Sequence, residues 1–549
     1  MRDALTRRQS LALVGGTFVG LNVAGYELGD QLTRKDTATG ALRRFATTVE
    51  GAEFTGLFVT DDGTLFCNVH GPAATNDKPY DRAAIGVFEG VDVRSIPVEF
   101  DGLSPSWTRQ GRKRFRSRFG SHRVLANGGD PTDDGEQLGV TTEPDGEPLT
   151  DASKPDFNAF VPFEASTDGA TAGYLYTSWE HTTGAVSRLH LRRDGDASTG
   201  RWTVLRSENL DMRPISGIWR PCFGTVSPWG TPLFSEEYEP DARKWYQGES
   251  YQEAGEPPDH ELVEQYLGYF GNPYRYGWVV EAVDPLASSP RFEKRFALGR
   301  FSHENALVLP DRRTVYLTDD VDGDDGLWGV FFKFVADRPG DLTAGTLFAA
   351  KLTQDAGSDP GTVGFDVTWL ELGHATESEV ASWVREYDGQ EVGGASITDE
   401  EIAEWAAGDG ADDRAAFLES RRAAIAVGAT GEWSKMEGVN AKPDAVPGDG
   451  LYLAVSRIEG QMLDGGSTSG GNDIRLDGLR QGVLYRATLG ATYDIARIEP
   501  AVVGSRNGLW GPDNVVVLDD GRVLVGEDGA HVPNQLWLFD PGATDSARK

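Results

Sequence analysis

The stretches TDDGTLF (residues 60–66) and LDDGRVL (residues 518–524) have nearly the same sequence, although they lie at opposite ends of the chain. Each has an Asp-Gly pair followed by strand-forming residues, the pattern of a tight hairpin turn. PDRRTVY (residues 310–316) varies this pattern, and short runs such as GLFV (residues 56–59) and YLYT (residues 174–177) recur between turns rich in Gly, Asp, Asn and Pro. The sequence therefore predicts a chain of short antiparallel strands.

This strand-turn-strand unit recurs along a chain of 549 residues that contains 68 glycines. Repetition of one small unit is typical of radial folds, with a β-sandwich as the alternative. With blades of roughly 40–50 residues plus insertions, we expect an all-β fold, a six-bladed β-propeller in one domain over residues 40–549. Residues 376–425 break the pattern and predict an inserted helical segment, in which Thr398 and Glu401 have the spacing of a capping box.

The composition is strongly acidic. There are 86 acidic and 52 basic side chains, a formal net charge of −34, and a sequence pI near 4.6. Such a field repels nucleic acid and anionic lipid, so no nucleic-acid partner is expected. Only 11 of the basic residues are lysines. An acid-rich, lysine-poor surface suits concentrated salt, where repulsion is screened within about 3 Å at 1 M. We therefore expect a halophilic protein, with a merely solubilised surface as the alternative.

The N-terminal region, residues 1–30, has the layout of a twin-arginine signal. Arg7 and Arg8 directly precede the short apolar stretch ALVGGTFVGL (residues 12–21). We therefore expect export by this route to an extracellular or cell-surface location, with an uncleaved signal as an anchor left open. No apolar run reaches the roughly 18 residues of a membrane span, and we expect no span in the mature chain.

The most informative stretch is PCFGTVSPWGTPLFSEE (residues 221–237). In it a cysteine precedes a rigid turn rich in Gly, Pro and Trp, and the predicted strand that follows ends in two glutamates. A cysteine thiolate is a soft ligand for transition metals, and paired carboxylates suit hard cations such as calcium. By composition alone, a buried structural role is favoured for Cys222 over a metal-binding one, and Cys67 is an ordinary strand residue.

This stretch resembles the Cys-x-Gly-x-x-Thr-Pro-Trp-Gly-Thr…Glu-Glu motif of the PhoX-type calcium-dependent alkaline phosphatases. Further stretches resemble the same family in the same order: YGWVVE (276–281), LGRFSHENA (298–306), KMEG (435–438), PDN (512–514) and GED (526–528). A blade that usually comes late in the family is similar to residues 54–72 here, which implies a circularly permuted member. A closed ring tolerates such a change of cut point.

The resemblance implies a six-bladed propeller with Fe³⁺ and Ca²⁺ ions at its axis. By the family pattern Cys222 would bridge two ferric ions and Glu304 and Glu437 would bind iron, while Glu237 and Asp513 would be further ligands. Weaker ligand candidates are Glu236, Asp319, Asp320 and Asp528, each of which is otherwise a solvated turn acid. Two substrate contacts of the family are changed here. Lys435 stands in place of a phosphate-binding arginine, and Ser178 in place of an asparagine.

The resemblance implies a metal-dependent phosphatase-like hydrolase that acts on small-molecule phosphomonoesters, and we expect it to be exported and monomeric. Clustered cations would neutralise the phosphoryl oxygens and position a nucleophile. The changes at Lys435 and Ser178 keep two alternatives open, a calcium-dependent lactonase-type hydrolase and a non-catalytic propeller that metals only brace.

Overall fold

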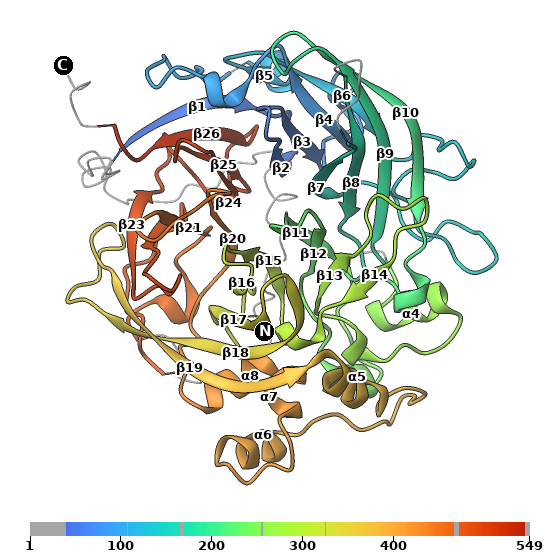
Figure 1. Ribbon diagram of the computed structural model, residues 1–549, viewed down its shortest axis with the longest axis vertical. Helices are drawn as coiled ribbons and strands as arrows, with labels where there is room; N and C mark the ends of the chain where they lie inside the picture. Colours follow the sequence, from blue (N-terminus) through green and yellow to red (C-terminus); the bar gives the residue numbers. More distant parts are fainter. Residues whose placement is uncertain are drawn as a thin grey trace, which may run out of the picture.

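The computed structural model describes residues 40–543 apart from 107, 165–169, 254–255, 324–325 and 466–470. The expected twin-arginine region, residues 1–30, lies outside them. The chain is mostly β and forms several antiparallel sheets arranged around a common centre (Figure 1). No helix in the described ranges is long and apolar enough to cross a membrane.

Three of the sheets are four-stranded. The first has the order β2-β3-β4-β6 and consists of β2 (Glu53–Val59), β3 (Leu65–His70), β4 (Ala84–Glu89) and β6 (Ser121–Asn127). The second runs β10-β9-β8-β7 and consists of β7 (Pro155–Pro162), β8 (Thr171–Trp179), β9 (Ala185–Asp194) and β10 (Arg201–Leu210). The third runs β11-β12-β13-β14 and consists of β11 (Pro221–Val226), β12 (Pro232–Glu236), β13 (Val279–Ala282) and β14 (Phe292–Lys294).

A nine-stranded sheet contains two four-stranded meanders that are joined through β19 (Phe365–Thr376). One meander is β15 (His303–Val308), β16 (Thr314–Asp319), β17 (Phe332–Arg338) and β18 (Asp341–Gln354). The other is β20 (Met436–Ala441), β21 (Gly450–Val455), β22 (Val483–Thr488) and β23 (Arg497–Val503). Only Phe365 and Asp366 of β19 pair with β23, so the link between the two meanders is short.

The last sheet combines the two ends of the described chain. Its order is β24-β25-β26-β1-β5, and it consists of β24 (Pro512–Val517), β25 (Val523–Glu527), β26 (Gln535–Asp540), β1 (Ala41–Thr47) and β5 (Arg116–Ser117). β1 pairs with β26 along almost its whole length, from Ala41 opposite Asp540 to Thr47 opposite Gln535. This pairing fastens the N-terminal strand to the C-terminal meander and closes the arrangement.

The first strand of each meander faces the centre. β2 contacts β7, and the contacts continue through β11, β15, β20 and β24 back to β2, so these inner strands form a closed circle (Figure 1). The apolar core lies between neighbouring sheets. Phe157 and Tyr176, for example, pack with Phe234 and Val280 of the next sheet. Cys67 lies buried in β3, Cys222 lies buried in β11, and both are free thiols.

The hairpin turns expected from the repeated sequence are present. Gly63 and Gly521 both have positive φ, at 85° and 86°. The flanking residues close each turn with the same hydrogen bond, from Thr60 N to Thr64 O at 2.9 Å and from Leu518 N to Arg522 O at 2.8 Å. Glycine adopts a positive φ readily, which explains why glycine follows aspartate in both turns. In the third turn, Arg312 takes the same left-handed conformation at φ 60°.

Helices occupy few positions outside the sheets. Between β19 and β20 lie α5 (Glu377–Arg385), α6 (Asp399–Ala406), α7 (Arg414–Leu418) and α8 (Ser420–Ala426), at the lower edge of Figure 1. The Thr398 and Glu401 capping box is formed in both directions. The remaining helices within the described residues are α2 (Arg109–Arg112), α3 (Ala242–Tyr246), α4 (Asp259–Leu267), and the 3₁₀ turns η1 (Val93–Ser95), η2 (Arg213–Ile215), η3 (Pro273–Arg275), η4 (Phe296–Leu298) and η5 (Gly460–Met462).

Candidate metal centre

Five of the inner strands share a local irregularity at their central ends. In β7, β11, β15, β20 and β24, the pairing with the second strand of the meander shifts register directly after the first pair, for example between Pro221 and Gly224 of β11. Such bulges re-aim side chains. In each of these strands the residue at the shift carries an acid or a thiol, and these residues are Asp156, Cys222, Glu304, Glu437 and Asp513.

The second strands of the same five meanders add a matching set of side chains. The residue directly after each strand donates its backbone N–H to the residue directly before the inner strand, as Glu180 does to Lys154 (2.8 Å) and Glu237 to Arg220 (3.2 Å). The five residues at this position are Glu180, Glu237, Asp320, Ser456 and Asp528. Because side chains alternate along a strand, this position and the residue at the register shift belong to the same face.

Together these positions form one acid-rich group at the centre of the molecule, which we call the central cluster. It consists of Glu53, His70, Asp156, Glu180, Cys222, Glu237, Glu304, Asp320, Glu437, Asp513 and Asp528. Within it, one ligand atom each from Cys222, Glu237 and Glu304 lie within 4.8 Å of one another, and so do atoms of Glu304, Glu437 and Asp513. Glu304 belongs to both groups.

Glu304 lies where two of the ligand groups meet. Its carboxylate is fully buried, and neither oxygen has a hydrogen-bond partner among the described residues. Burial, followed by the nearby carboxylates of Glu437 and Asp513, raises the pKa of Glu304 well above its usual value. A buried carboxylate without a partner costs several kcal/mol. A cation at this point would remove that cost.

Cys222 lies beside the same acids, with its Sγ 3.8 Å from Asp156 Oδ2. Burial raises the pKa of the thiol well above its usual value, and the carboxylates of Asp156, Glu237 and Glu304 raise it further. The thiol is therefore neutral unless a bound cation favours the thiolate, which is the form that binds metals.

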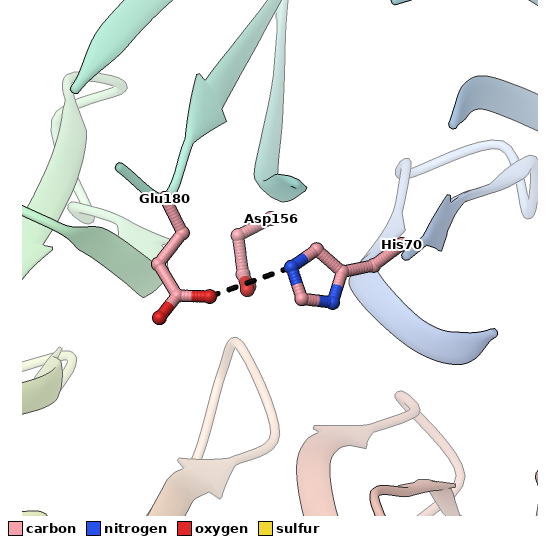
Figure 2. A group of neighbouring side chains, drawn as sticks. All are labelled: His70, Asp156 and Glu180. Carbon is pink, nitrogen blue, oxygen red and sulfur yellow. Dashed lines mark ion pairs between the residues drawn. The ribbon is translucent and has the colours of Figure 1, made fainter. Parts of the chain in front are cut away.

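A second part of the cluster centres on His70 (Figure 2). Its Nε2 lies 3.4 Å from Glu180 Oε2, and its Nδ1 contacts Glu53. The Asp156 carboxylate also belongs to this group, whose ligand atoms lie within 4.8 Å of one another. Burial lowers the pKa of His70, but the carboxylates of Glu53 and Glu180 outweigh it and bring the pKa to about 10. A further acid group joins Glu53 to Asp513 and Asp528.

Lys435 places an ammonium group among the acids of the cluster. Its Nζ contacts Asp320, lies 3.5 Å from Glu437 Oε1 and 3.9 Å from Glu237 Oε1, and donates to the Tyr238 hydroxyl at 3.1 Å. The side chain is 1% exposed. Lys435 thus offsets part of the negative charge of the cluster, and its predicted role as a phosphate contact stays a prediction.

The structure does not bring every candidate to the cluster. Glu236 accepts hydrogen bonds from Lys294 Nζ (2.8 Å) and from the backbone N–H groups of residues 219, 277 and 278. Asp319 is held by Arg421 Nε and Nη2 at 2.8 and 2.6 Å. Ser178 Oγ accepts from Phe157 N at 2.9 Å and faces the carbonyl groups of residues 221 and 222. Their predicted site roles gain no support from these contacts.

Sequence reasoning missed Glu53, His70, Asp156 and Glu180. A sequence signal existed for Glu180. Four of the five meanders carry an acid directly after the second strand, and Glu180 holds that position after β8. His70 and Glu53 are opposite one another in the pairing of β2 with β3. Nothing in the sequence alone places Asp156 beside Glu180, because the pairing of β7 with β8 is not encoded in a short motif.

A cavity of about 520 Å³ opens onto the cluster and gives access to it. Glu53, His70, Glu180 and Asp528 of the cluster line its floor, together with Trp219, Arg220, Tyr238 and Tyr251 from neighbouring loops. The cluster is therefore a group of carboxylates with one thiol and one imidazole, and part of it lines a cavity large enough for a small organic molecule.

The family model described as "Alkaline phosphatase PhoX" matches residues 186–546. The chain belongs to the PhoX family. The match runs from β9 through β26 and so includes most members of the central cluster. No curated protein matches the chain.

Among solved structures, an oxidoreductase (glucose dehydrogenase) from Thermus thermophilus is 11% identical, with a TM-score of 0.32 over 91% of this chain and 100% of that chain. The WD40 domain of SCAP from fission yeast is 8% identical, with a TM-score of 0.28 over 92% and 99%. Likenesses at this level carry no functional information.

The PhoX family is metal-dependent, and the residues of the central cluster fit metals. Carboxylate oxygens suit calcium, and a thiolate suits a transition metal such as iron. The buried Glu304 carboxylate has no other partner in the described chain. Membership of the family supports a phosphatase-type hydrolase, with a small molecule as its substrate.

Proposed function

We propose that this protein is an exported phosphomonoester hydrolase whose active site is the central cluster, loaded with calcium and iron. The single observation that carries the proposal is the buried Glu304 carboxylate, which has no hydrogen-bond partner in the described chain and is surrounded by the like charges of Glu437 and Asp513. Family membership supports the type of reaction.

The proposed architecture is a six-bladed propeller. Two blades form the nine-stranded sheet, joined by the short pairing of β19 with β23, and the other sheets contribute one blade each. The closed circle of inner strands and the register shift that each of them contains support this reading. In this architecture the ring brings one or two ligands from each blade to the same point.

The proposed division of labour follows donor chemistry for Cys222 and the family resemblance for Glu304 and Glu437. Cys222, Glu304 and Glu437 would hold iron, and the remaining carboxylates of the cluster would hold calcium. Cations there would supply Lewis-acid stabilisation of the phosphoryl charge. The chain's own residues hold and orient these ligands, Lys435 keeps a positive charge beside Asp320, and the surrounding sheets exclude bulk water.

The test compares a chromogenic phosphate monoester with a lactone, in molar salt with added calcium. We expect the purified protein to hydrolyse the phosphate ester, and removal of metal by a chelator to abolish turnover. Turnover of the lactone alone would favour the lactonase alternative, and turnover of neither would favour a propeller that metals only brace.

The iron assignment has its own test in Cys222→Ser. Charge transfer from a thiolate to ferric iron colours a protein. The variant should therefore lose colour and iron but keep most of its calcium, which prefers oxygen ligands. If the wild-type protein is colourless and iron-free, the iron part of the proposal is wrong.

A further inference from the structure

The wall of the cavity carries an arginine whose setting differs from that of Lys435, whose ammonium group lies among the acids of the central cluster. Arg220 lines the 520 Å³ cavity together with Glu180 and His70 of the cluster. It directly precedes β11 and stands two residues before Cys222. A group bound at the cluster from the cavity side would therefore lie next to this guanidinium.

Arg220 holds the same structural position as Lys435. Both residues directly precede an inner strand, and the carbonyl group of each accepts the backbone N–H of the residue that follows the second strand, Glu237 for Arg220 and Ser456 for Lys435. The side chains differ in their partners. The Lys435 side chain is 1% exposed, and its ammonium group contacts carboxylates of the cluster itself. The Arg220 side chain is 14% exposed and lines the cavity.

The guanidinium of Arg220 is fixed but not saturated. Its Nη2 lies 3.1 Å from each oxygen of Asp259, and its plane packs on the rings of Tyr251 and Trp219 at 4.9 and 5.7 Å. Nε has no hydrogen-bond partner in the described part of the chain, and both hydrogen bonds of the guanidinium to Asp259 are made by Nη2. Because Nε is itself buried, the donor that remains for a ligand is Nη1.

The backbone at Arg220 is held in an unfavourable conformation. Its φ is +35°, a left-handed value that is unfavourable for a residue with a side chain and is often kept at functional sites. The hydrogen bonds of Arg220 N to His181 O (2.8 Å) and of Glu237 N to Arg220 O (3.2 Å) hold it there. The position of the guanidinium is thus determined by backbone, ion pair and aromatic contacts together.

We propose that Arg220 is the residue that binds a phosphoryl oxygen of the substrate in this protein, and that Asp259 and Tyr251 are its positioning residues. An arginine offers a planar array of donors that matches an oxyanion better than the single ammonium of a lysine. The aromatic rings of Trp219 and Tyr251 beside it leave an apolar wall for the organic part of a phosphate ester. This inference rests on the proposed function, since it assigns a substrate contact of the same site.

The test uses inorganic phosphate as the probe and the calcium-loaded protein. Its dissociation constant is measured by calorimetry, and its inhibition constant is measured against the chromogenic ester. Arg220→Gln should raise both constants at least tenfold. Arg220→Lys, which keeps the charge and part of the Asp259 pair, should also raise them about tenfold because the planar donor array is lost. Calcium-dependent thermal stabilisation should be kept in both variants, which separates a lost contact from a lost metal site.

Arg206→Gln is the matched control, because Arg206 also pairs with both oxygens of an aspartate, Asp134, but on the exposed surface. It should change the phosphate constants less than twofold. Constants within twofold of wild type in Arg220→Lys, or in a folded Arg220→Gln, would overturn the inference while leaving the proposed function intact. A wild-type protein that neither binds phosphate nor hydrolyses the ester would instead remove the proposed function itself.

Discussion

Three strands of the molecule end in a pair of adjacent acids, and the two members of each pair have different surroundings. Glu236, Asp319 and Glu527 are the last residues of their strands, and Glu237, Asp320 and Asp528 follow them directly. The first members have cationic or N–H partners. Glu236 binds Lys294, Asp319 binds Arg421, and Glu527 accepts from Trp510 N and Trp537 Nε1. The second members lie in the central cluster.

The difference follows from strand geometry. Consecutive side chains of a strand point to opposite faces, so only one member of each pair can reach the centre. The member that points away lies in the protein interior and needs partners that the fold supplies. The member that points inward joins other acids, whose mutual repulsion a bound cation or a proton would offset. Glu236, Glu237, Asp319 and Asp320 are all fully buried, so their partners and not their burial distinguish the two settings.

Glu236→Gln should have the largest effect on stability. It leaves the buried Lys294 ammonium, which is 3% exposed, without its carboxylate partner. Breaking such a pair costs about 3–5 kcal/mol, and this should appear as a lower midpoint in chemical denaturation. The double variant Glu236→Gln/Lys294→Met should recover part of the loss. An unchanged midpoint in the single variant would show that the pair does not have the structural role given to it here.

Glu304→Gln should lower activity without lowering the stability of the metal-free protein. Removing this carboxylate should lower kcat/KM for a phosphate ester by about 10²–10³-fold, the range for loss of one electrostatic group in an active site. It should leave the metal-free protein at least as stable as wild type, because a repulsive charge is removed. A metal-free Glu304→Gln protein that is much less stable than wild type would mean that Glu304 has a structural partner, and the comparison of the acid pairs would break down.

Calcium should stabilise the native state because it binds the folded cluster and not the dispersed acids of the unfolded chain. At a hundredfold excess over Kd the gain is about 2.7 kcal/mol, measured as a shift in thermal unfolding with and without chelator. The shift should be the same in Arg206→Gln and smaller in Asp513→Asn, which removes one of the carboxylates assigned to calcium. A melting curve that a chelator leaves unmoved would contradict the assignment of the cluster as a cation site.

Glu377 belongs neither to the acid pairs nor to the central cluster, and it tests how burial changes the pKa of a carboxyl group. Burial raises its pKa from 4.5 to about 7. The folded protein therefore holds this proton more tightly than the unfolded chain, so its contribution to stability is lost as the pH rises from about 4.5 to about 7. In Glu377→Gln the loss of unfolding free energy between these two pH values should be smaller by on the order of 1–2 kcal/mol, a figure reduced to allow for the partial exposure of Glu377. Identical denaturation midpoints against pH in variant and wild type would contradict the raised pKa.

Local signals in the sequence predicted the repeating hairpins, the helical segment and most of the central cluster. The Asp-Gly turns at Gly63 and Gly521 could be predicted because glycine is favoured at positive φ. Cys222, Glu304 and Glu437 could be predicted through their family motifs.

The rest depended on side-chain direction and on long-range pairing. The sequence EE at 236–237 does not say which glutamate faces the centre, since that depends on the register of β11 with β12. Glu53 and His70 come from β2 and β3, and Asp156 from β7, so only the closed arrangement of inner strands brings them to the cluster. The partners of Lys435 could not be foreseen for the same reason.

The central claim is that the inward-facing acids hold cations and that their neighbours in the acid pairs do not. Elemental analysis of calcium and iron per chain tests it most directly, in wild type, Glu304→Gln and Glu236→Gln after dialysis against metal-free high-salt buffer. We predict bound calcium and iron in the wild-type protein, a clear loss of metal in Glu304→Gln, and wild-type metal content in the folded fraction of Glu236→Gln. Metal-free wild-type protein, or equal metal content in wild type and Glu304→Gln, would contradict the account.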